Sequence, residues 1–213
     1  MLRQLVIETA TEALSLALFD DEVCVARYHD VIGRGHAEQL MPRIAALPGG
    51  GRAGGIAVDT GPGSFTGLRV GLAAARALGY AWEAPVCGFS ALAMVALAAQ
   101  RIHPAEGAEA IVAVITGGHG ELFWQKFDRH SLAPLTSPAS TPINSLSALV
   151  TEHRLYGSGA EVLVTARSFG DAVTLHPDAA DFPMLPAAHV RATAAPLYGR
   201  NADAVPSAAR MTF

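Results

Sequence analysis

The chain contains very little lysine and little charge of either sign. Of its 15 Lys and Arg residues only Lys126 is a lysine, and charged residues make up 16% of the 213 positions. The formal net charge is −4, and no basic stripe of the kind that attracts nucleic acid is visible. We therefore expect that this chain does not bind RNA by itself.

Long apolar runs are also missing. No uninterrupted apolar stretch reaches the length of about 18 residues that crosses a membrane, because the alanine-rich run 70–81 contains Arg76. Arg3 and Gln4 fall inside the first predicted strand, where a cleaved leader would have its apolar region. These patterns predict a cytoplasmic protein with no membrane contact.

Cysteine is scarce, with Cys24 and Cys87 far apart in apolar, strand-like surroundings. We expect both to be reduced thiols in the core, which is typical of cytosolic proteins. No Cys and His spacing suggests zinc, and we predict no metal site.

Apolar residues, by contrast, make up 51% of the chain, which predicts a folded protein with a large core. The low charge also leaves apolar surface to cover, and this favours a protein partner.

The most informative stretch reads Gly-Pro-Gly-Ser-Phe-Thr-Gly-Leu-Arg, residues 61–69. It follows a short apolar strand, 55–60, and precedes an alanine-rich helix, 70–82, which Ser64 can cap. The spacing fits neither a Walker A loop, nor a dinucleotide fingerprint, nor a nucleophile elbow. The pattern alone leaves two readings open, a turn that lets a helix pack closely on a sheet and an anion-binding turn.

The order of the predicted elements indicates the fold class. Strands at 2–8, 13–19 and 22–28 form a meander, and helices at 35–47, 70–82 and 91–100 then alternate with strands at 55–60 and 86–89. A meander followed by helix-separated strands is typical of an α/β ribonuclease-H-like unit, the half of an actin-like or Hsp70-like ATPase fold.

The second half begins the pattern again in a smaller form. Strands are expected at 110–116, 121–127, 155–160 and 173–176, helices at 145–152 and 186–194, an irregular stretch at 134–142, and an extended tail from Ala195. We therefore predict two lobes, residues 1–102 and a reduced second lobe, residues 103–213.

Several segments, in the same order, resemble the TsaB (YeaZ) family of tRNA threonylcarbamoyladenosine biosynthesis proteins. The glycine stretch 61–69 is the specific match. Weaker ones are Glu-Thr-Ala-Thr-Glu at 8–12, the His-containing segment 35–42, Phe-Ser-Ala-Leu at 89–92, Gly-Glu-Leu-Phe-Trp at 120–124 and Pro-Leu-Tyr-Gly-Arg at 196–200. The family usually has Asp-Ala-Arg where this chain reads Thr116-Gly117-Gly118.

The resemblance implies an accessory subunit without catalytic residues of its own. It would dimerise with the catalytic subunit TsaD, work with the ATPase TsaE, and meet tRNA only through the complex that transfers a threonylcarbamoyl group to the adenosine beside the anticodon. Alone it would form a homodimer, and any ATP would sit at the complex interface, since the chain is expected to have no cofactor of its own.

The resemblance also implies which residues carry these roles. Partner contact is expected from the His-bearing helix and from the helix after the glycine turn, at His36, Gln39, Leu40, Phe65, Leu68, Arg69, Leu72 and Arg76. A vestigial nucleotide site would involve Glu8, Thr9 and Thr11. Catalytic relatives hold a metal with His-x-x-x-His, and here Leu40 stands at the second His position.

The alternative is a stand-alone enzyme of the actin-like superfamily, either a metallopeptidase or a small-molecule kinase. A peptidase would need a metal pair or an activated serine, and a kinase a carboxylate near Thr116. A third reading, direct tRNA binding, would require strongly salt-dependent affinity.

Overall fold

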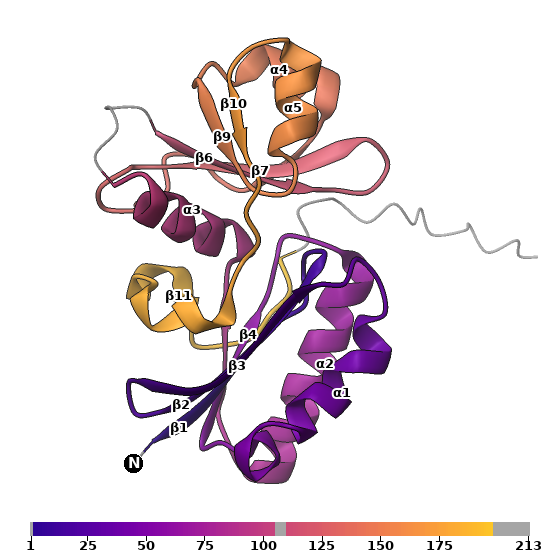
Figure 1. Cartoon of the computed structure of the whole chain (residues 1–213), viewed down its shortest axis with the longest axis vertical. Helices are drawn as coiled ribbons and strands as arrows, with labels where there is room; N and C mark the ends of the chain where they lie inside the picture. Colours follow the sequence, from indigo (N-terminus) through magenta and orange to yellow (C-terminus); the bar gives the residue numbers. More distant parts are fainter. Residues whose placement is uncertain (1, 105–109, 198–213) are drawn as a thin grey trace, which may run out of the picture.

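The computed structural model describes residues 2–104 and 110–197, which form two sheets with helices around and between them (Figure 1). In the first lobe, the strand order is β3-β2-β1-β4-β5-β11. Its strands are β1 (Arg3–Glu8), β2 (Ala13–Asp20), β3 (Val23–Val31), β4 (Gly55–Asp59), β5 (Val86–Phe89) and β11 (Val190–Arg191).

The second sheet has the order β10-β9-β6-β7-β8. Its strands are β6 (Ile111–Thr116), β7 (Glu121–Phe127), β8 (Ala139–Pro142), β9 (Arg154–Tyr156) and β10 (Asp171–Val173). The strands β1 and β6 occupy the same place in the two sheets, each with an antiparallel neighbour on one side and a parallel neighbour on the other. This repeated order confirms the predicted ribonuclease-H-like, two-lobe fold.

The helices divide the core into three regions. The helices α1 (His36–Ala45) and α2 (Phe65–Trp82) lie side by side on one face of the first sheet, whereas α4 (Ile143–Leu149) and α5 (Ala160–Arg167) cover the outer face of the second (Figure 1). Between the sheets lies α3 (Ala91–Ile102), whose buried residues join both sheets into one core. None of the helices that the structure describes is long and apolar enough to span a bilayer.

The segment after β10 crosses back to the first lobe, although the sequence assigned it to the second. The Asp178 carboxylate accepts a hydrogen bond from Ala180 N at the start of the 3-10 helix η2 (Ala179–Met184), and it pairs with Arg27 of β3. A second 3-10 helix, η3 (Ala187–His189), leads into β11, which pairs with β5. The predicted helix 186–194 is wrong, because edge pairing with β5 holds residues 190–191 extended.

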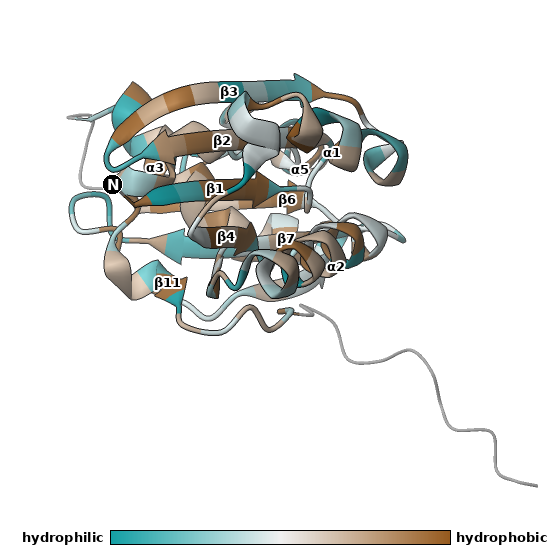
Figure 2. Ribbon diagram, turned by 90° about the horizontal axis from the view of Figure 1, so that it is seen from below, coloured by the Kyte–Doolittle hydropathy of each residue, from teal (hydrophilic) through white to brown (hydrophobic). Residues whose placement is uncertain are grey.

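Smaller differences concern the exposure of Cys24 in β3 and several short elements that the sequence did not predict. Figure 2 shows β3 at the edge of the sheet with apolar residues along it. The prediction of a core thiol at Cys24 is wrong, because this edge strand leaves the side chain exposed; Cys87 is half-buried. The helix α5 and the strand β8 had not been predicted, and a 3-10 turn, η1 (Pro48–Gly51), follows α1.

Candidate functional site

The glycine turn lies directly against the turn between β1 and β2. Ser64 N donates to Ala10 O at 2.7 Å, and Thr9 Oγ1 donates to Gly67 O at 2.8 Å. A Cβ placed on Gly63 or on Gly67 would lie 2.1 Å from Ala10 O or 2.0 Å from Thr9 O, closer than atoms can approach. The glycines are therefore needed for close backbone contact. This supports the interpretation of residues 61–69 as a turn that lets a helix pack closely on a sheet.

Ser64 caps α2 as the sequence predicts, since its hydroxyl accepts from Gly67 N at 3.3 Å. The helix begins at Phe65, five residues earlier than the alanine-rich run suggested. As a result Phe65 and Arg69 belong to the helix itself and share a side of it.

Two buried carboxyl groups lie under these turns. Glu8 ends β1 and Asp59 ends β4, and the register of these parallel strands places them side by side. Both are buried, with at most 1% of their surface exposed. Burial raises the pKa of Glu8 well above its usual value and the charge of Asp59 raises it further. Burial also raises the pKa of Asp59, to about 7.

The hydrogen bonds of the two carboxyls differ. Glu8 Oε2 accepts from Ala10 N at 2.9 Å, and its Oε1 accepts from the amide and the hydroxyl of Thr11 at 3.2 and 3.1 Å. Asp59 Oδ1 accepts from Gly61 N at 2.6 Å, and the backbone N–H groups of Gly61 and of Ala91, at the start of α3, both lower the pKa of this carboxyl against the effect of burial.

The residues of the expected nucleotide site are thus engaged inside the lobe. Glu8, Thr9 and Thr11 are all buried, and each makes a hydrogen bond to the turns around it. Nucleotide binding by them stays a prediction. Asp59 was missed, although a polar pair directly after an apolar strand, Asp59-Thr60, is the kind of signal that marks a site at the end of a strand.

The eight residues expected to contact a partner fall into two groups. His36, Leu40, Leu68 and Leu72 are buried in the first lobe. His36 Nε2 lies 3.0 Å from Ala13 O, and the leucines pack toward the sheet. Because these four side chains are buried, we do not expect them to contact a partner directly. They pack beneath the exposed residues of α1 and α2.

The other four are accessible. Phe65 is 54% exposed, and the guanidinium of Arg69 lies over its ring at 3.5 Å from the centroid. Arg76 is exposed and donates to Ala194 O of the returning segment, and Gln39 is half-buried on α1. Partner contact stays a prediction for these residues.

Around them the outward sides of the two helices form one surface, which we call the α1–α2 face. It consists of the exposed residues Ala37, Met41, Phe65, Arg69, Ala73, Ala77 and Tyr80. Met41 is 45% exposed and Tyr80 is 90% exposed. Because the alanines between the aromatic rings are small, another helix can approach this face closely.

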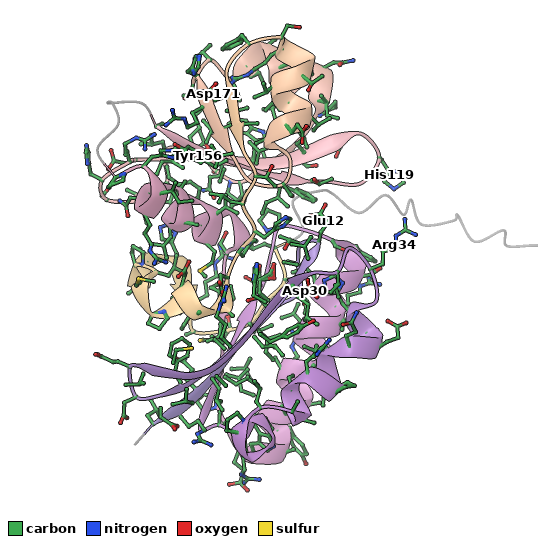
Figure 3. All side chains as sticks on the ribbon, in the orientation of Figure 1. Glu12, Asp30, Arg34, His119, Tyr156 and Asp171 are labelled. Carbon is green, nitrogen blue, oxygen red and sulfur yellow. The ribbon has the colours of Figure 1, made fainter. Side chains whose placement is uncertain are left out.

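A pocket of about 380 Å³ opens at the amino-terminal ends of α1 and α2. It is lined by Gly33, Arg34, Gly35, His36, Ala37, Glu38, Ser64, Thr66 and Gly67. Arg34 lies at the end of the first lobe nearest the second lobe (Figure 3). Across residues 2–104 and 110–197, no three His, Cys, Asp or Glu side chains are placed to hold one metal ion.

Comparison with known proteins gives a consistent result. The family model described as "TsaD: tRNA N6-adenosine threonylcarbamoyltransferase" matches residues 30–152. The tRNA threonylcarbamoyladenosine biosynthesis protein TsaB of Escherichia coli is 35% identical over 133 residues, which are 60% of this chain and 56% of that protein. The matched region therefore spans about half the length of the curated relatives.

Solved structures match over a longer region. A protein of Pseudomonas aeruginosa with similarity to peptidase YEAZ superposes with a TM-score of 0.74 at 28% identity, over 94% of this chain and 100% of that one. The structure named YeaZ from the same organism gives 0.72 at 27%, over 93% and 100%.

The sequence motifs, the repeated sheet order and these matches agree. Because the family model covers more than half of the chain, this protein belongs to the TsaD family of tRNA N6-adenosine threonylcarbamoyltransferase domains, and within it resembles the TsaB/YeaZ proteins.

Proposed function

We propose that this chain is an accessory subunit of tRNA threonylcarbamoyladenosine biosynthesis that docks on the catalytic subunit TsaD through the α1–α2 face. In this role it holds TsaD in an active assembly with TsaE, while TsaD transfers the threonylcarbamoyl group. tRNA meets the chain only through the complex. Without TsaD, the same face joins two copies of the chain.

The exposed apolar character of this face is the observation that carries the proposal. Phe65 and Tyr80 lie near the two ends of α2 on its outward side, with Ala73 and Ala77 between them. A large exposed aromatic ring loses little conformational freedom on binding and is a typical energetic centre of an interface. The buried leucines Leu68 and Leu72 fix α2 on the sheet, so that the face is already formed before docking.

The chemistry of the first lobe favours docking over catalysis. Glu8, Thr9 and Thr11 serve the packing of two turns, and Leu40 stands where catalytic relatives place a metal-binding histidine. The pocket beside the α1–α2 face is where we would look for ATP at the complex interface.

The test is co-purification of the chain with TsaD from the same organism, followed by titration of the purified partners. Phe65→Ala should weaken the complex at least tenfold, or about 1.4 kcal/mol, since an exposed aromatic ring of the α1–α2 face loses its partner contacts. Arg69→Glu should weaken it as well, and both variants should lower threonylcarbamoyladenosine formation in a reconstituted reaction.

The second lobe offers a matched control. Phe169 is also an exposed ring, 44% accessible, and Arg167 lies over it at 4.1 Å. Phe169→Ala should leave affinity for TsaD unchanged. Equal effects of the two alanine variants, or no complex with nucleotide present, would refute docking through this face. ATP or peptide turnover by the chain alone, lost in Glu8→Ala, would instead support the enzyme alternative.

A further inference from the structure

The residues that follow β11, 192–197, run from the edge of the first sheet to the glycine turn, and we call them the clamp segment. Their backbone passes closely over β5, because a Cβ placed on Gly88 would lie 3.3 Å from both Ala194 Cα and Thr193 O. Ala194 also packs against the part of the core beneath α1 and α2. The clamp segment is therefore held on the first lobe along its length.

The far end of the clamp segment is bonded to the start of the glycine turn. Leu197 N donates to Thr60 O at 2.7 Å, and Thr60 itself donates to Phe89 O of β5 through its backbone N and its hydroxyl, at 2.9 and 2.8 Å. A Cβ placed on Gly61 would lie 3.1 Å from Leu197 O and 3.0 Å from Leu68 Cδ1 of α2. Leu197 and Leu68 thus both lie against Gly61, so that the clamp segment fixes the turn from which α2 begins.

A second contact joins the clamp segment to the middle of α2. Arg76 Nη2 donates to Ala194 O at 2.8 Å. On a helix surface, residues three and four positions apart are neighbours, and Arg76 therefore lies beside Ala73 and Tyr80 of the α1–α2 face. The clamp segment consequently holds α2 both at its start and at its middle.

We propose that the clamp segment keeps α2 in the position that docking requires, so that closure of the clamp and TsaD binding favour each other. This inference rests on the function proposed above. Arg76 is then a positioning residue, whose guanidinium is engaged inside the chain, and not a partner contact. A surface that is already formed loses less freedom on binding, and the coupling must act equally in both directions.

Three substitutions open the clamp or test its donors. Arg76→Met keeps the aliphatic stem and removes the guanidinium, whereas Arg76→Lys keeps one donor for Ala194 O. Leu197→Pro removes the N–H group that donates to Thr60 O, and Leu197→Ala is its matched control because it retains that N–H. We expect all of these variants to fold, which circular dichroism and urea unfolding check.

Hydrogen exchange of the free, full-length chain, followed by NMR, measures clamp opening directly. The Leu197 amide bonds to Thr60 O, and the Leu68 amide, which donates to Ser64 O, reports on the first turn of α2. Both amides should exchange about fivefold faster in Arg76→Met, the effect of losing one hydrogen bond, and less so in Arg76→Lys. Phe65→Ala, which removes a contact residue, should leave both rates unchanged.

Titration with TsaD measures the coupling to docking. Arg76→Met and Leu197→Pro should each lower the affinity up to about fivefold, and Leu197→Ala should lower it less than Leu197→Pro. Because both substitutions open the same clamp, the double variant should bind no more weakly than the sum of the single effects predicts, and clearly less weakly if each alone opens it. Saturating TsaD should slow exchange of the Leu197 amide by about the same factor.

The outcomes separate this inference from the docking proposal. Unchanged exchange in Arg76→Met would overturn the clamp, and lower affinity with unchanged exchange would make Arg76 a direct partner contact. Fully additive losses in the double variant would also overturn a shared route. If the wild type formed no complex with TsaD, docking would be refuted, and exchange in the free chain would then decide whether the clamp exists.

Discussion

The close contact between Gly67 and the β1–β2 turn leads to a prediction that opposes helix propensity. An added methyl group at position 67 would lie 2.0 Å from Thr9 O, over one ångström closer than an ordinary contact of 3.4 Å or more. The obstacle is a backbone oxygen, so no side-chain rotation relieves it. The first turn of α2 must move away from the sheet.

The magnitude follows from opposing terms. Alanine at an internal helix position gains about 1 kcal/mol over glycine. Overpacking in a filled core costs about 1–3 kcal/mol or more, and the displaced turn loses the bond from Thr9 Oγ1 to Gly67 O, worth about 1 kcal/mol. Because the clash involves backbone on both sides, we expect Gly67→Ala to lower the free energy of unfolding by about 2–3 kcal/mol.

Thermal and urea unfolding followed by circular dichroism measure this change. For a chain of this size, the loss corresponds to a fall in Tm of about 4–12 °C. Gly55→Ala is the matched control, because its methyl group would meet nothing within 4 Å, and it should be neutral or slightly stabilising. If Gly67→Ala were as stable as wild type, the close packing of the glycine turn would be refuted.

The remaining predictions separate supporting residues from contact residues. Leu72→Ala should cost about 2–5 kcal/mol of unfolding free energy, measured in urea, because the side chain is buried beneath α2. Phe65→Ala should change the unfolding free energy by less than about 0.5 kcal/mol, so that any loss of TsaD affinity comes from lost contacts with the partner. Similar losses of unfolding free energy in Leu72→Ala and Phe65→Ala would contradict this distinction. Asp178→Asn should destabilise by about 1–2 kcal/mol at pH 7, because it weakens the pair with Arg27 and the cap of η2. Burial alone would raise the pKa of Asp178, but the Arg27 guanidinium and Ala180 N outweigh it and lower this pKa on folding. The stabilisation by Asp178 is therefore present above the unfolded pKa of about 4 and disappears as the pH falls. The difference between the two proteins should therefore shrink toward pH 3, and a constant difference would show that packing, not charge, is responsible.

Local patterns were sufficient for the central part of the fold. Strand β5 and strand β7 were predicted with their observed bounds, 86–89 and 121–127, and the cap Ser64 was predicted correctly. These elements combine apolar runs with clear turn signals, so tertiary contacts did not have to decide their type.

The side of a helix that is buried was harder to predict than the presence of the helix itself. A helix such as α2 has apolar residues on more than one side, and spacing alone does not show which side meets the sheet. Leu68 and Phe65 are three positions apart and both were predicted to contact a partner, yet one is buried and the other exposed. The helix α5 was missed because it is short and follows a glycine turn that also fits a strand end.

Long-range pairing was not predictable from local patterns. Asp59 is informative only when β1 and β4 are adjacent, because its neighbour Glu8 is about fifty positions away in sequence. In the same way, nothing near residue 190 indicates that it completes a sheet begun at residue 3.

The return of the C-terminal segment means that the first lobe is not continuous in sequence. A ribosome that has completed residue 102 has produced the meander, α1, α2 and α3, but β5 then still lacks β11, its neighbour on the open edge, and Arg27 lacks Asp178. Unpaired strand edges attract other chains, and folding during synthesis proceeds from the amino terminus. The open edge of β5 in the nascent first lobe therefore stays exposed until residues 178–191 have left the ribosome. Slow translation of the second half would prolong this exposure.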